Sequence, residues 1–159
     1  MVTISRDVAT SATGVWDILA DGWTYASWVV GAAHIREVDP AWPAVGSRLH
    51  HSVGTWPLML HDFTEVRAAE PARSLVLRAR AWPMGEAQVT VTLAPVGADS
   101  CRVTMEEHPV RGPGAWLHNP ASEALLRARN VETLRRLDSL AVGHRPDPDG
   151  SGRPVGQEA

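Results

Sequence analysis

One long segment near the C-terminus has the pattern of a helix, and it follows a series of short segments that alternate like strands. Asn119 and Pro120 suit a helix start, because an asparagine side chain can cap free backbone N–H groups and a proline at the first helical position needs no donor. The segment continues unbroken through Ala141. The sequence therefore predicts a single long helix closing a many-stranded sheet, an arrangement that suggests a grip around a cavity.

The predicted helix has one apolar face, whose members recur at steps of three and four residues. They are Leu126, Asn130, Thr133, Leu134 and Leu137. Asn130 is a polar residue within this face, so we take Leu126 and Asn130 as candidate ligand contacts. For the neighbouring Arg129 we expect a surface ion pair, the common fate of a helical arginine.

The length of 159 residues fits one domain with its own core. We expect this domain to span residues 1–142, and residues 143–159, rich in proline, glycine and charge, to form a disordered tail. No signal-like start is present, and no apolar run approaches the roughly 20 residues that cross a bilayer. We expect a soluble, cytoplasmic protein without a membrane partner, either a monomer or a homodimer.

Composition excludes several kinds of chemistry. All fifteen basic residues are arginine, so a lysine Schiff base is impossible. The net charge of −3 and the scattered arginines give no basic stripe for nucleic acid. The single Cys101 lies in a strand-like run and is expected to be a core residue.

The order of the predicted elements indicates an α+β fold. A strand at residues 2–8 is followed by two short helices, the first capped by Ser11 and the second at about residues 23–28. Six further strands are expected at residues 34–38, 48–53, 58–68, 74–81, 86–93 and 101–108. Their connections are too short for crossover helices, which favours antiparallel pairing.

Strand alternation predicts which polar side chains face the interior. Leu49 and Val53 bring His51 inward, and Thr64 and Val66, with Leu58 and Leu60, bring Asp62. In the last strand Cys101, Val103 and Met105 bring Glu107 inward. His51, Asp62, Glu107 and Asn130 would then form a polar minority on an apolar lining, which is typical of a ligand site. For each of them alone, the alternative is an ordinary structural role, such as a loop cap, an ion pair with arginine or a hydrogen-bonded core histidine.

Seven tryptophans stand against one tyrosine and one phenylalanine. Trp16 is expected in the core, and Trp42 and Trp82 at the domain edge. Trp28, Trp56 and Trp116 lie at element ends or in loops, where an indole can stack on a flat ligand. With Leu60 and Met105 they complete the predicted ligand contacts.

Several site types find no support. Adjacent His50 and His51 point to opposite faces of a strand and cannot readily chelate one metal ion. The chain has no nucleophile elbow, no phosphate-binding loop and no dinucleotide fingerprint. We therefore expect neither a metal nor a cofactor.

Three stretches resemble a known family, namely VWDILADGWTYASWVVGA (15–32), GTWPLMLHDFTEV (54–66) and VTMEEHPVRGPGAWLHNPASEALLRARNVETLRRL (103–137). The family is the START-like (SRPBCC) helix-grip superfamily, specifically the bacterial group labelled polyketide cyclase/dehydrase. The resemblance covers nearly all of residues 1–142. It implies a seven-stranded antiparallel sheet wrapped on the long terminal helix, around a cavity for a hydrophobic small molecule. It implies no reaction, because the superfamily includes cyclases, dehydratases and carriers.

Three hypotheses on function remain. The first is a binding protein for a small hydrophobic molecule, either aromatic, polyketide-like or a lipid. The second is a cofactor-independent cyclase or dehydratase, in which Glu107 or Asp62 removes a proton and His51 or Asn130 polarises a carbonyl. The third, a protein-interaction module, has less support because the apolar surface is directed inward.

Overall fold

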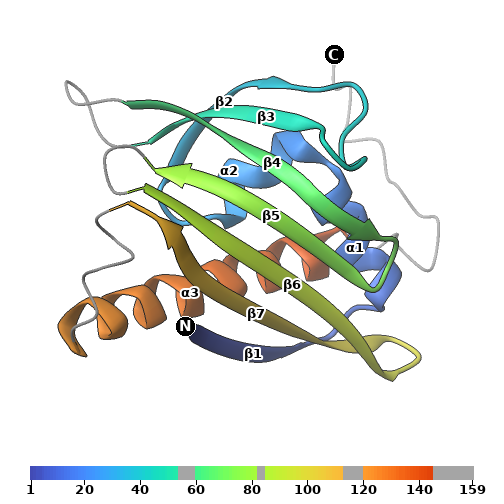
Figure 1. Cartoon of the computed structure of the whole chain (residues 1–159). Helices are drawn as coiled ribbons and strands as arrows, with labels where there is room; N and C mark the ends of the chain where they lie inside the picture. Colours follow the sequence, from blue (N-terminus) through green and yellow to red (C-terminus); the bar gives the residue numbers. More distant parts are fainter. Residues whose placement is uncertain (54–59, 82–84, 113–119, 145–159) are drawn as a thin grey trace, which may run out of the picture.

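The computed structural model describes residues 1–53, 60–81, 85–112 and 120–144 (Figure 1). Seven antiparallel strands form one sheet in the order β1-β7-β6-β5-β4-β3-β2, and Figure 1 shows the helices on one of its faces. The strands are β1 (Val2–Val8), β2 (Ala32–Val38), β3 (Arg48–Val53), β4 (Leu60–Glu70), β5 (Ser74–Ala81), β6 (Gly85–Gly97) and β7 (Ser100–Arg111). The helices are α1 (Ala12–Ala20), the 3-10 turn η1 (Gly22–Thr24), α2 (Tyr25–Trp28) and α3 (Pro120–Gly143). The predicted α+β order and antiparallel sheet are confirmed.

The two longest strands extend beyond the segments that the apolar alternation predicts. β6 runs to Gly97 and β7 from Ser100 to Arg111, and the pair Gly97 and Ser100 closes their hairpin. Pro95 interrupts the alternation, but a register shift between Pro95 and Gly97 lets the ladder continue. Backbone pairing therefore lengthens these strands where side-chain pattern gives no signal.

The start of α1 follows from its cap, as predicted. Ser11 accepts a hydrogen bond from the Gly14 N–H at 3.2 Å, which satisfies one of the free donors of the first turn. Asp21 follows the helix and accepts from the Trp23 N–H at 2.9 Å, which starts η1. α1 and α2 thus form a short bent connection from β1, at one edge of the sheet, to β2 at the other.

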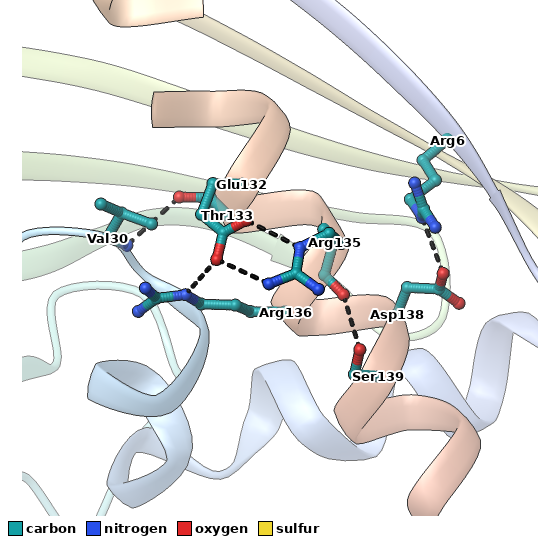
Figure 2. A network of polar contacts seen from close by, with 8 residues as sticks. All are labelled: Arg6, Val30, Glu132, Thr133, Arg135, Arg136, Asp138 and Ser139. Carbon is teal, nitrogen blue, oxygen red and sulfur yellow. Dashed lines mark hydrogen bonds and ion pairs between the residues drawn. The ribbon is translucent and has the colours of Figure 1, made fainter. Parts of the chain in front are cut away.

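The C-terminal half of α3 packs closely, whereas its first turns are exposed. Thr133, Leu134, Leu137 and Ala141 are buried, but every residue from Pro120 to Leu125 is exposed. Two polar contacts hold the packed half, namely Arg6 of β1 to Asp138 at 2.7 Å and the Val30 N–H to Thr133 Oγ1 at 3.2 Å (Figure 2). The helix is therefore fixed at its C-terminal half.

Several predicted features lie outside the described residues. These are Asn119, Leu58, the indoles of Trp56, Trp82 and Trp116, and residues 145–159 of the expected tail. Cys101 is fully buried in β7, as predicted.

Candidate functional site

The inner face of the sheet, which faces the helices, is apolar at one end and carries polar groups at the other. At the polar end His51 lies opposite Asp62, Thr64 opposite Ala79, and Glu107 opposite Val89. This is the end at which β3 leads to β4, β5 to β6 and β7 to α3. The apolar end holds residues that are almost fully buried, among them Val8, Leu75, Val91, Leu93, Cys101 and Val103.

Side-chain burial decreases towards the polar end. Leu75 and Leu77 of β5 are buried, but the next inward residue, Ala79, is only half-buried. On β6 the same change occurs between Val91, which is buried, and Val89, which is half-buried. Since alanine fills little volume and Ala87 lies directly opposite Ala79, the described residues cover the inner face less completely here than at the apolar end.

Three side chains form a hydrogen-bonded chain at this end. Thr64 Oγ1 lies 3.1 Å from His51 Nε2 and 3.2 Å from Tyr25 Oη. The Tyr25 ring stacks on the His51 ring at 5.7 Å between centroids, and the Trp28 ring meets Tyr25 edge-on at 5.3 Å. Tyr25 and Trp28 project from α2, so this short helix joins β3 and β4 through aromatic and polar contacts together.

Among the residues that the structure describes, two polar atoms of this group find no hydrogen-bond partner. They are Trp28 Nε1 and His51 Nδ1, and their residues are only 2% and 4% exposed. An unsatisfied buried polar group costs about 1–3 kcal/mol, so it is uncommon in a structural core. Trp42 provides the contrast, because its Nε1 donates to the Leu19 carbonyl at 3.2 Å.

A second polar group links α3 to β7. Glu107 Oε2 accepts hydrogen bonds from Arg129 Nη2 and, at 2.9 Å, from Asn130 Nδ2. Arg129 also donates from Nε to Asn130 Oδ1 at 3.2 Å. Glu107 and Asn130 are buried as predicted, whereas the Arg129 side chain is 39% exposed. Arg129 does form an ion pair, but with a buried partner rather than with a surface carboxylate.

Burial and neighbouring charges shift the pKa values of two ionisable groups of the site. Burial lowers the pKa of His51, and the nearby Asp62 carboxylate opposes that change. Burial also raises the pKa of the Tyr25 hydroxyl, which feels the charges of both Arg129 and Glu107. Tyr25 therefore lies within electrostatic reach of both polar groups of the site.

Asp62 is buried, as predicted, at 7% exposure. Its Oδ1 accepts a hydrogen bond from the Phe63 N–H at 2.9 Å, and Arg80 Nε lies 3.9 Å away. One oxygen of this carboxylate is therefore hydrogen-bonded to the backbone of its own strand.

The remaining predicted ligand contacts differ in their burial. Met105 and Trp28 are buried and Leu126 is half-buried, whereas Leu60, at the start of β4, is 37% exposed. Leu60 is thus not buried, although the alternation predicted that it would be. Trp56 and Trp116 lie outside the described residues. The contribution of these residues to a ligand site stays a prediction.

Sequence reasoning did not assign Tyr25 to the site, and it gave Thr64 no role beyond facing inward. Tyr25 stands three residues before Trp28, a spacing that places two side chains on one face of a helix. This spacing is the signal that would have included Tyr25. Thr64 becomes a bridging residue only through the pairing of β3 with β4.

Within the described part of the chain, no three His, Cys, Asp or Glu side chains gather as a metal site. None of its helices is long and apolar enough to cross a membrane.

Comparison with known proteins supports the fold and shows the family. Residues 1–142 match the family model described as polyketide cyclase / dehydrase and lipid transport. No curated protein matches the chain by sequence.

Several solved structures share the fold at low sequence identity. The START superfamily protein from Mycobacterium smegmatis superposes with a TM-score of 0.69 and 15% identity, over 91% of this chain and 98% of that one. The Zhui aromatase/cyclase from Streptomyces sp. R1128 gives 0.67 and 18%, over 94% and 96%. A protein of Nitrosomonas europaea gives 0.68 and 17%, over 89% and 94%. These likenesses establish the helix-grip fold. The match of the family model over residues 1–142 shows that the chain belongs to the polyketide cyclase/dehydrase and lipid transport family.

Proposed function

We propose that this chain binds a small hydrophobic molecule, either aromatic, polyketide-like or a lipid, between the first half of α3 and the polar end of the sheet. One observation carries the proposal. Inward-facing apolar residues are less buried at this end than in the rest of the sheet. Ala79, Ala87 and Val89 are half-buried, and the first turns of α3 are exposed. Ligand sites are mostly apolar with a few placed polar groups, which is the composition found here.

The contacts of the two carboxylates favour binding over cyclase or dehydratase chemistry. A general base needs a carboxylate oxygen that can reach the substrate proton. One oxygen of each carboxylate is engaged, Glu107 Oε2 by Arg129 and Asn130 and Asp62 Oδ1 by the Phe63 N–H. Such hydrogen bonds are typical of carboxylates with a structural role in a site.

A blocking substitution tests the proposal. Ala79→Phe would place an aromatic ring on the inner face beside Thr64, where a ligand would lie. We expect the purified parent protein to bind 2-naphthol or a medium-chain fatty acid, measured by titration calorimetry, and Ala79→Phe to weaken this binding at least about ten-fold. Native mass spectrometry of the parent, purified from cells, would reveal a copurified molecule directly.

Ala94→Phe is the matched control. Ala94 is exposed on β6 and alternates with the inward-facing Leu93, so its side chain lies on the outer face. It should bind the probes as the parent does, and both variants should unfold cooperatively. A parent protein that binds no hydrophobic probe, or an Ala79→Phe variant that binds as well as the parent, would contradict the proposal.

A further inference from the structure

The connection between β2 and β3, residues 39–47, presents an apolar surface to solvent (Figure 1). Its residues 40–45 read PAWPAV, so none of them carries a charge and the Trp42 indole nitrogen is their one polar side-chain atom. Pro40, Ala41 and Ala44 are exposed, and Val45 is 68% exposed. Contiguous exposed apolar residues of this kind mark a site of interaction with a protein or a membrane.

The turn η1 adds an exposed tryptophan beside this connection. The Trp42 indole N–H donates to the Leu19 carbonyl at 3.2 Å, and a Cβ at Gly22 would lie 3.3 Å from the Trp42 ring. The residue after Gly22 is Trp23, which is 60% exposed. An indole has an apolar body and a polar N–H, so it favours the boundary between hydrocarbon and water. Trp23 and residues 40–45 together form what we call the loop patch.

The backbone of this connection has almost no free hydrogen-bond donor. Its two prolines have no N–H. Every other N–H group from residue 39 to residue 47, apart from that of Val45, bonds an oxygen of the described protein; Gly46, for example, donates to the Val66 carbonyl at 2.9 Å. A loop that enters the boundary of a bilayer loses water from its polar groups, so paired donors make entry less costly.

Lipid is the partner that this surface favours over a protein. A specific protein interface carries about one hydrogen bond per 100–200 Å² of buried area, whereas the loop patch has few donors to offer. No arginine lies between residues 37 and 47, and Asp21, Glu37 and Asp39 flank the patch. In a symmetric pair of chains these carboxylates would meet their own copies, and anionic lipid would repel them as well. A neutral lipid surface avoids both costs.

We propose that the loop patch docks the protein on the surface of an electrically neutral lipid bilayer, with Trp23 and Val45 entering the headgroup region. The sequence led us to expect no membrane partner, because no apolar run is long enough to span a bilayer; docking at the surface needs no such run. The patch precedes β3, and the ligand site of the proposed function lies at the other end of that strand, where it leads to β4. Docking therefore does not depend on the proposed function.

Sedimentation of the full chain with lipid vesicles tests this docking. We expect the parent to bind vesicles of phosphatidylcholine and phosphatidylethanolamine, and added phosphatidylglycerol not to tighten the binding. Val45→Glu places a charge in the loop patch and should weaken the binding at least about five-fold. Val131→Glu is the matched control, because Val131 is exposed on α3, outside the patch; it should bind as the parent does.

Ala79→Phe separates docking from the uptake of a lipid into the ligand site. This variant should bind neutral vesicles as the parent does, and a loss of binding would assign the vesicle binding to the ligand site and overturn the docking. Failure of the parent to bind neutral vesicles, or a Val45→Glu variant that binds as well as the parent, would also overturn it. A dimer that Val45→Glu dissociates, in a protein that binds no vesicles, would assign the patch to a second copy of the chain instead.

A measurement on the unaltered chain covers the case in which Val45→Glu disturbs the fold. In a nitrogen–proton correlation spectrum with small bicelles that contain spin-labelled phosphatidylcholine, the amide signals of residues 41, 42 and 44–46 and the Trp23 indole signal should broaden strongly. The Val131 amide signal should broaden much less. Equal broadening of all these signals would contradict docking through the loop patch.

Discussion

His51 shows how a single buried residue ties the stability of the site to its protonation. Its imidazole lies between the Tyr25 ring and the Thr64 hydroxyl, and it is 4% exposed. Burial holds the pKa of His51 below its ordinary value of 6.5, although Asp62 opposes the shift. The folded state therefore binds a proton at this site less readily than the unfolded state does.

This difference predicts the sign of a pH effect. Below pH 6.5 the unfolded chain takes up a proton at His51 before the folded chain does, so the free energy of unfolding falls as the pH decreases. The stability that neutral His51 contributes is present above pH 6.5 and is lost as the pH falls through its lowered pKa. Urea unfolding of the parent and of His51→Gln between pH 7.5 and 5.5 measures this effect.

The His51→Gln variant should have a shallower pH dependence than the parent. The exposed His34 on β2 provides the control, and His34→Gln should keep the parental slope. If the slopes of the parent and His51→Gln coincide, burial of neutral His51 is not a source of the acid sensitivity.

Alternation along the strands was enough to predict that His51, Asp62 and Glu107 face inward. Helical spacing did the same for Asn130, and all four residues are buried. Their partners were not predictable, because a bond such as Glu107 to Arg129 depends on how β7 and α3 pack against each other. Alternation along a strand gives the face to which a side chain points, whereas tertiary packing determines which groups it contacts.

The helices and strands were predicted well where the side-chain pattern is strong. Their ends were predicted less well where backbone geometry determines them. The start of β6 is such a place, since Gly85 has a φ of +116°. A Cβ at this position would lie 1.9 Å from the Arg111 carbonyl oxygen on β7. The β6–β7 ladder can approach this closely only because residue 85 has no side chain.

Gly85→Ala should accordingly destabilise the protein. The substitution combines a φ value that L residues rarely adopt with a backbone clash, and we expect a loss of about 3 kcal/mol in the free energy of unfolding. Denaturant unfolding gives this number. Gly143→Ala is the control, because a Cβ there meets no atom within 4 Å; it should change stability by less than about 1 kcal/mol. Equal stability of the two variants would mean that β6 and β7 separate at this end without cost.

For the molecule as a whole, α3 has two parts with different roles. Its C-terminal half closes the core, where Leu137 is fully buried, and its first turns lie beside the incompletely covered end of the sheet, where Leu125 is 74% exposed. Sequence periodicity predicted the helix and its apolar face. It could not show how closely each turn packs, from the exposed turns at Pro120 to Leu125 to the buried residues from Asn130 onward, because packing depends on the position of the sheet.

Two leucines on this helix test the division. Leu137→Ala removes a buried side chain and should lower the free energy of unfolding by about 3 kcal/mol, because a cavity remains in the core. Leu125→Ala, the same change on an exposed turn, should cost less than about 0.5 kcal/mol. Thermal unfolding of both variants beside the parent measures the difference. Comparable losses would show that both halves of α3 are held equally by the sheet.

The strand order also determines how the molecule is completed during synthesis. β1 leaves the ribosome before the other strands of this sheet, yet among the described strands it pairs only with β7, which is made after all the others of the sheet. Its backbone groups therefore stay without their native partners until about a hundred further residues have been translated, and α3, which covers the inner face, follows later still. Contacts between such distant residues slow folding. The seven-residue β1 therefore reaches its native place in the sheet only after β7 has been made, and α3 follows β7.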